Sequence, residues 1–212
     1  RYLGIQANYG FIIPHSTSIE AISHTKPYGF EISFNKLHTS FDRWKVFNAY
    51  WSTGIQAGYF NYQNPEVIGS AFLLTVYAEP IVTFTRRFQL SVKTGTGLSY
   101  HTKIYDEIEN PTDFFFGTRF NFPLYVDLRF KYRIGEHTFL TLSGCYNHIS
   151  NGGFKQPNKG MNFPVVSAGM DYYFNDVPVL SHQYTSERKI PGRGIFYTVQ
   201  FLTTVKVLEK SD

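Results

Sequence analysis

Cysteine is nearly absent from this chain of 212 residues, in which Cys145 is the only one. A single cysteine excludes an intramolecular disulfide framework and most cysteine-based zinc sites. The histidines other than His148 show neither the i, i+4 nor the H-x-H spacing that is typical of metal ligands. We therefore expect no metal and no cofactor.

Long apolar runs and clusters of positive charge are missing as well. No run of 18 apolar residues occurs, so the sequence predicts no transmembrane helix. The net charge of +4 is spread along the chain without a Lys- or Arg-rich run, so nucleic acid is not an expected partner. Gly95-Thr96-Gly97 lacks the further glycine and the helix of a phosphate-binding loop. The first residues already read as a strand, which fits a mature chain whose signal peptide has been removed or omitted.

Aromatic residues and alternating segments are what the sequence has in abundance. Phe, Tyr and Trp make up 18% of the chain, with 21 Phe and 16 Tyr. Apolar and polar residues alternate with a period of two, which predicts β-strands. The predicted strands are 3–13, 30–35, 49–60, 71–78, 88–101, 119–133, 140–150, 162–174 and 195–206. Between them we expect a loop at 42–44, a turn at 61–65, a break from Pro80 to Arg87 and a solvated loop at 102–113.

The segment 119–133 shows the clearest alternation. One face carries only Phe, Leu, Val and Tyr, while the other includes Asp127, Arg129, Lys131 and Arg133. Unpaired charges in a dry core cost several kcal/mol each, whereas a wet or ion-paired lumen accepts them. A strand of this length, about 46 Å at roughly 3.3 Å per residue, also suffices to cross a lipid bilayer when tilted.

These patterns predict an all-β fold, an antiparallel up-and-down transmembrane β-barrel with its apolar face toward lipid. We expect eight strands in a barrel domain at 1–174, and a C-terminal extension at 175–212 with a possible ninth strand. Bacterial single-chain barrels have even strand numbers, so either the ninth strand is not in the barrel or later strands are missing from this sequence. A soluble barrel with the faces inverted and a lipophilic ligand inside is the alternative, with the charged stripe in solvent.

The segment 145–165 carries the residues that point to chemistry. His148 and Ser150 are two apart, so on a strand they share one face, where a base and a hydroxyl nucleophile can meet. Asn151, Gly152 and Gly153 follow, with backbone N–H groups that can stabilise an oxyanion. This is the outline of an acyl-transfer site. Because these side chains have the parity of the lipid-facing side, the substrate is expected to be a lipid.

His148-Ile149-Ser150-Asn151-Gly152-Gly153, with Pro157-Asn158 and Gly160, resembles the lipid A 3-O-deacylase (PagL-like) family. These are acyl hydrolases of the Gram-negative outer membrane, eight-stranded barrels with a Ser-His-Glu triad on the outer surface. The resemblance implies Ser150 as nucleophile, His148 as general base and 151–153 as the oxyanion site. The family's Glu, about a dozen residues after the serine, is replaced here by Asn162, which would orient the imidazole without supplying charge.

The resemblance implies a carboxylic ester hydrolase that modifies lipopolysaccharide in the bacterial outer membrane, with lipid A or a related glycolipid as its substrate. A second hypothesis is a non-catalytic outer-membrane barrel with a structural, porin-like or surface-binding role. Asn162 favours this second hypothesis, because the charged member of the triad is missing.

Overall fold

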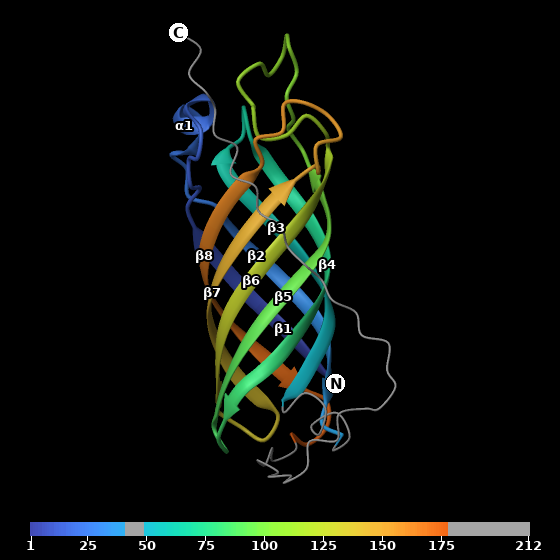
Figure 1. Ribbon diagram of the computed structural model, residues 1–212. Helices are drawn as coiled ribbons and strands as arrows, with labels where there is room; N and C mark the ends of the chain where they lie inside the picture. The colour runs from blue at the N-terminus through green and yellow to red at the C-terminus, as the bar shows by residue number, and fades with distance from the viewer. Residues whose placement is uncertain (41–48, 178–212) are drawn as a thin grey trace, which may run out of the picture.

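The computed structural model describes residues 1–40 and 49–177, which form a closed barrel of eight antiparallel strands. Each strand pairs with the next along the chain, and β8 pairs with β1 to close the barrel (Figure 1). The strands are β1 (Tyr2–Gly10), β2 (Tyr28–His38), β3 (Tyr50–Asn64), β4 (Gly69–Phe84), β5 (Phe88–His101), β6 (Phe120–Arg133), β7 (Thr138–Ser150) and β8 (Met161–Tyr173). The predicted up-and-down barrel is confirmed.

The predicted orientation of the two faces is also confirmed. Along β6 the apolar side chains from Phe120 to Tyr132 point outward and are 37–58% exposed, while the residues between them are buried in the lumen. An inverted barrel with a lipophilic interior would require the opposite arrangement. The apolar outer surface of β6 suits lipid, as expected for a membrane barrel.

The lumen contains a buried network of ion pairs, centred near the C-terminal ends of β6 and β8. Lys131 Nζ lies 2.8 Å from Glu79 Oε1 and 2.9 Å from Asp171 Oδ2. Arg129 contacts the same two carboxylates at 3.7 and 4.0 Å, and Asp127 at 3.2 Å. Charges removed from water require such partners, so the charged stripe of β6 fits an ion-paired lumen rather than a dry core. These side chains fill the interior at this level, which argues against an open pore.

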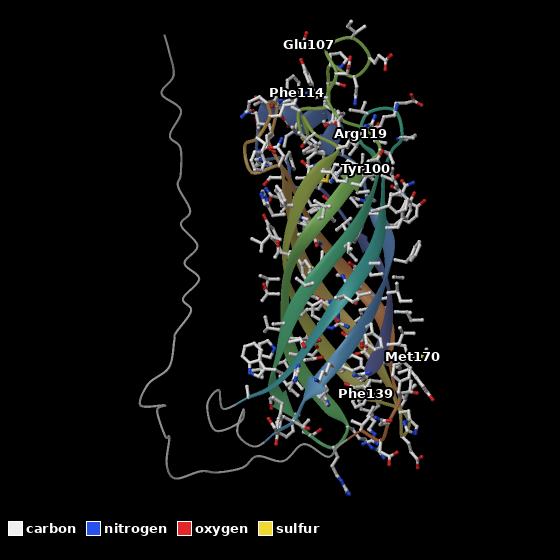
Figure 2. All side chains as sticks on the ribbon, turned by 90° about the vertical axis from the view of Figure 1, so that its right-hand side faces the viewer. Tyr100, Glu107, Phe114, Arg119, Phe139 and Met170 are labelled. Carbon is white, nitrogen blue, oxygen red and sulfur yellow. The ribbon has the colours of Figure 1, made fainter. Side chains whose placement is uncertain are left out.

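The two ends of the barrel differ in the length of their loops. At one end the connections 85–87 and 134–137 are short, the connection between β2 and β3 lies mostly outside the described residues, and the chain begins there (Figure 1). At the other end lie the segment 11–27 and the loops 102–119 and 151–160. Figure 2 shows Glu107, Phe114 and Arg119 at this end, far from Phe139 and Met170. Outer-membrane barrels carry their long loops on the extracellular side, which places the end of β7 there.

A hydrophobic cluster closes the long-loop end from within. Helix α1 (Thr17–Ser23) contributes Ile19 and Ile22, and the loop 102–119 contributes Phe115 and Phe116. Ile149 of β7 is fully buried in the same cluster. The loop predicted to be solvated, 102–113, is exposed at 106–109 and 111–112, whereas Asn110 and Asp113 within it and residues 115–117 after it are buried. The cluster anchors the end of β7 and thereby the residues on either side of Ile149. No helix within the described ranges is long and apolar enough to cross a membrane.

Several strand boundaries differ from the sequence prediction: β1 ends at Gly10 instead of residue 13, β2 is longer at both ends, and the largest differences are in β3 and β4. β4 continues through Pro80 to Phe84, and the β4–β5 partner pairs stop at Ala78 and resume at Ile81, so the missing N–H of Pro80 interrupts the ladder only locally. β3 continues into the predicted turn because an irregular register between Asn61 and Asn64 absorbs the extra residues. The predicted ninth strand at 195–206 and the loop at 42–44 lie outside the described residues.

Candidate active site

His148 and Ser150 lie on the outer face of β7, at its extracellular end. Both side chains are half-buried, while Ile149 between them points into the barrel. The alternation of the strand thus places the base and the hydroxyl on one surface, as predicted. In the register, His148 stands opposite Leu124 of β6, and Ser150 opposite Phe122.

Asn162 is the partner of His148 across the β7–β8 hairpin. The two residues form a register pair, and His148 Nδ1 lies 2.7 Å from Asn162 Oδ1. An amide oxygen only accepts hydrogen bonds, so Nδ1 carries the proton and donates it to this contact. The Nε2 atom then has the lone pair that a general base needs. Asp171, a carboxylate on the same strand, points into the lumen and contacts Lys131 instead.

Gly160 lets the returning chain pass close over the base and the hydroxyl. A Cβ atom at this position would lie 3.1 Å from His148 Cε1 and 3.4 Å from Ser150 Cβ, and the residue has a φ of +70°. Glycine adopts this conformation without strain and leaves the space open. Within the described part of the chain, no hydrogen bond joins Ser150 Oγ to His148. Such contacts often tighten only when substrate is bound.

The predicted oxyanion residues are largely occupied in holding the loop 151–160. Asn151 is buried, and its backbone N–H donates to Asn158 Oδ1 at 3.0 Å. Its side-chain amide donates to the Lys155 carbonyl at 2.7 Å and accepts from the Gly153 N–H at 2.9 Å. Of the three predicted donors, only the Gly152 N–H is without a hydrogen-bond partner among the described residues. It is therefore the donor that remains available to a substrate.

The loop 102–119 supports the loop 151–160 from the side. Phe114 and Phe115 carbonyls accept hydrogen bonds from the backbone N–H groups of Lys159, at 3.1 Å, and Gly160, at 3.3 Å. A Cβ at Gly117 would lie 2.9 Å from the carbonyl oxygens of Gln156 and Pro157, so the two backbones are in close contact. Neither contact is encoded in the motif around His148. The loop over the site is thus positioned by a segment more than 30 residues away in sequence.

Asp113 is the buried carboxyl of this supporting loop. Its Oδ1 accepts the Phe115 N–H at 3.0 Å, while Oδ2 is buried without a partner in the described structure. Burial raises the pKa of Asp113 to about 7, against the smaller opposing effect of the hydrogen bonds from the Phe115 and Phe116 backbone. The carboxyl is therefore easiest to accommodate when it is protonated.

His15 is a site residue that the sequence analysis missed. Its Nδ1 lies 3.3 Å from Asn162 Nδ2, and its Nε2 lies 2.9 Å from the Lys159 carbonyl. No local pattern could have indicated it, because 147 residues separate His15 from Asn162. Among the residues that the structure describes, no group of three or more His, Cys, Asp or Glu is arranged to hold a metal.

An apolar groove of about 590 Å³ runs along the outside of the barrel beside these residues. Its lining includes Tyr146, two residues before His148 on the same face, and it crosses from β7 over β8 to β1. Gly144 opens its floor, since a Cβ there would have no neighbour within 4 Å. The lining residues are Tyr9, Gly10, Phe11, Lys26, Gly144, Cys145, Tyr146, Pro164, Val165 and Val166.

The barrel, its lipid-facing surface and the polar groups at its extracellular rim define an outer-membrane β-barrel protein. The family model described as lipid A 3-O-deacylase (PagL) matches residues 28–171, more than half of the chain. The chain belongs to this family, and its place is the bacterial outer membrane. No curated protein sequence matches it.

Two solved structures show the same fold at low sequence identity. The crystal structure of the outer membrane enzyme PagL is 16% identical with a TM-score of 0.54, over 78% of this chain and 97% of that one. Neisserial surface protein A (NspA) is 12% identical with a TM-score of 0.55, over 82% of this chain and 96% of that one. One of these proteins is an enzyme and the other a surface protein, so the fold alone does not assign an activity.

Proposed function

We propose that this protein is a serine ester hydrolase that removes an acyl chain from lipid A or a related outer-membrane glycolipid. The observation that carries the proposal is the 2.7 Å contact from His148 Nδ1 to Asn162 Oδ1, beside Ser150 on the lipid-facing surface. This contact leaves Nε2 as the basic nitrogen on the side chain that shares a face with the hydroxyl. Family membership supports the same reaction.

In the first half of the reaction, Ser150 Oγ attacks the ester carbonyl carbon while His148 Nε2 takes the hydroxyl proton. The carbonyl oxygen becomes an oxyanion, and we assign its stabilisation to the Gly152 N–H. Collapse of this intermediate breaks the bond to the sugar oxygen, which receives the proton from His148. The products are an acylated Ser150 and a free sugar hydroxyl.

In the second half, water attacks the acyl-enzyme and His148 takes the proton from that water. The bond to Oγ then breaks, Ser150 recovers its proton, and a fatty acid leaves. Asn162 holds the imidazole in the required tautomer but offers no negative charge to the imidazolium that forms in each half. We therefore expect slower turnover than a carboxylate at this position would allow.

The groove beside His148 supports a lipid substrate. An extended acyl chain lying along Tyr146, Gly144 and Val166 would stay in contact with apolar side chains while its ester lies at Ser150. Lys26 lines the same groove and supplies a positive charge near the rim, where a glycolipid carries its polar head group. A soluble ester would gain little from this surface.

The test is an assay of acyl loss by mass spectrometry, with purified protein in detergent and lipid A as substrate. Wild-type protein is expected to release one fatty acyl mass, and Ser150→Ala to release none. Ser143→Ala is the matched control, because this serine lies on the same strand but faces the lumen. Acyl loss that persists in Ser150→Ala would refute the assigned nucleophile.

A non-catalytic barrel is the second candidate, and the amide at Asn162 favours it. The variant Asn162→Glu separates the two candidates, because it restores a carboxylate beside His148. A faster rate in Asn162→Glu supports the hydrolase and the orienting position of residue 162. No acyl loss in wild type or in Asn162→Glu would leave a structural or surface-binding barrel.

A further inference from the structure

We infer that His15 is a positioning residue that sets the orientation of the Asn162 amide and, through it, the tautomer of His148. The effect of His15 on catalysis rests on the proposed function, whereas its effect on the tautomer of His148 does not. The basis of the inference is a series of hydrogen-bonded groups from the Lys159 carbonyl through His15 and Asn162 to His148. The series ends at His148 Nδ1, and a proton on this atom leaves Nε2 with the lone pair of the base.

The direction of each hydrogen bond in this series follows from the contact between Lys159 and His15. The Lys159 carbonyl, 2.9 Å from His15 Nε2, can only accept, so Nε2 carries the proton of the neutral ring. His15 Nδ1 is then an acceptor, and it takes a hydrogen bond from the Asn162 amide nitrogen at 3.3 Å. With its nitrogen turned to His15, Asn162 presents its oxygen to His148 Nδ1, which must be the protonated atom.

A second contact of His15 competes with this assignment and is the weaker of the two. The Ile13 carbonyl lies 3.4 Å from His15 Nδ1, and it would accept a proton from that atom. Since the Nε2 contact is shorter by half an ångström, the proton of the neutral ring belongs on Nε2. Nδ1 therefore keeps its lone pair for the Asn162 amide.

An amide needs this help, whereas a carboxylate does not. The two ends of the Asn162 side chain have the same shape but opposite hydrogen-bonding character. If the amide turned over, its NH₂ group would donate to His148 Nδ1 and move the imidazole proton to Nε2, where it blocks the base. A carboxylate has two accepting oxygens, so either orientation gives the correct tautomer. His15 thus fixes the orientation of the side-chain amide, which is needed because residue 162 is Asn and not a carboxylate.

The backbone holds His15 in place for this role. The Ile13 N–H donates to the Asn162 carbonyl at 2.8 Å, so the segment between β1 and α1 continues the pairing of β1 with β8. Lys159, which accepts from His15, is itself fixed by the Phe114 carbonyl. His15 lies outside residues 28–171, where the family model matches, so it belongs to a part of the chain that the family match does not cover.

The first test is a double-mutant cycle on the rate of acyl loss. His15→Ala in the wild-type background is expected to lower the rate about threefold to tenfold, the range that one lost neutral hydrogen bond corresponds to. In the Asn162→Asp background the same change is expected to lower the rate less than about twofold, because a carboxylate needs no orientation. His24→Ala, an exposed histidine at the end of α1, is the control in both backgrounds. Equal losses in the two backgrounds would show a merely structural role and overturn the inference.

The second test does not depend on activity. In protein with ¹⁵N-labelled histidine in detergent micelles, nitrogen chemical shifts report the tautomer of His148, assigned by its loss in His148→Gln. We expect the Nδ1-protonated form in wild type and a smaller share of it in His15→Ala. An unchanged tautomer would overturn the inference. If wild type releases no acyl chain but this shift occurs, the proposed function fails and the positioning role stands.

Discussion

Gly160→Ala tests whether the close passage of the β7–β8 loop over His148 and Ser150 matters for activity. The new methyl group would lie 3.1 Å from His148 Cε1 and 3.2 Å from the Ile149 carbonyl oxygen, both tighter than ordinary van der Waals contact. The backbone cannot easily retreat, because the Gly160 N–H is bonded to the Phe115 carbonyl. The imidazole therefore has to move by a few tenths of an ångström.

Two magnitudes follow from this geometry. A φ of +70° is unfavourable for alanine by about 1 kcal/mol, which lowers the stability of the loop but not of the barrel. A displacement of a catalytic group by about 1 Å can cost about 100-fold in rate. The smaller shift here, which also weakens the contact with Asn162, leads us to expect a loss of about tenfold in acyl release.

The assay compares the rate of acyl release with the folded fraction of each variant in detergent. Gly69→Ala is the matched control, because Gly69 has a φ of +68° and its added methyl would crowd Thr102 and Lys103 instead of His148. We expect Gly69→Ala to be destabilised but active, and Gly160→Ala to be folded but slow. Wild-type activity in Gly160→Ala, or an equal loss in both variants, would refute the reasoning.

Two further predictions concern the lumen and the supporting loop. Glu79→Gln leaves Lys131 and Arg129 with one carboxylate fewer in the buried network, and we expect it to lower the free energy of unfolding by about 3 kcal/mol, measured by urea titration of tryptophan fluorescence in lipid vesicles. Asp113, whose pKa is raised to about 7 by burial, binds a proton in the folded loop that the unfolded loop releases near pH 4. The stability of this loop should therefore fall as the pH rises from about 4 to about 7. The measurement is hydrogen exchange of the Phe115 amide, and Asp113→Asn should abolish its dependence on pH in this range.

Glu107→Gln is the control for both experiments, because this exposed residue at the tip of the loop 102–119 belongs to neither environment. An equal shift in the urea midpoint for Glu79→Gln and Glu107→Gln would contradict the assigned role of the lumen network. A pH dependence of loop protection that survives in Asp113→Asn would contradict the assigned role of the buried carboxyl.

The alternation of side chains along each strand was sufficient to predict the barrel and the placement of the candidate catalytic pair. Successive side chains of a strand point to opposite faces, which is a local property of the pleated backbone. The alternation alone therefore predicted that the charged stripe of β6 faces the lumen and that His148 and Ser150 lie on the outer face. Asn162 has the parity of the apolar, outward face of its own strand, which is why its place beside His148 was also predictable.

What only the tertiary structure decided are the contacts between segments that the closed barrel brings together at one rim. His15, the carbonyls of Phe114 and Phe115, and the internal bonds that occupy the Asn151 and Gly153 amides have no sequence pattern of their own. Their positions depend on how loops from different hairpins meet once the strands have tilted and closed. Sequence therefore determined which residues face the lipid, and the packing of the loops determined which of their hydrogen-bonding groups remain free to act there.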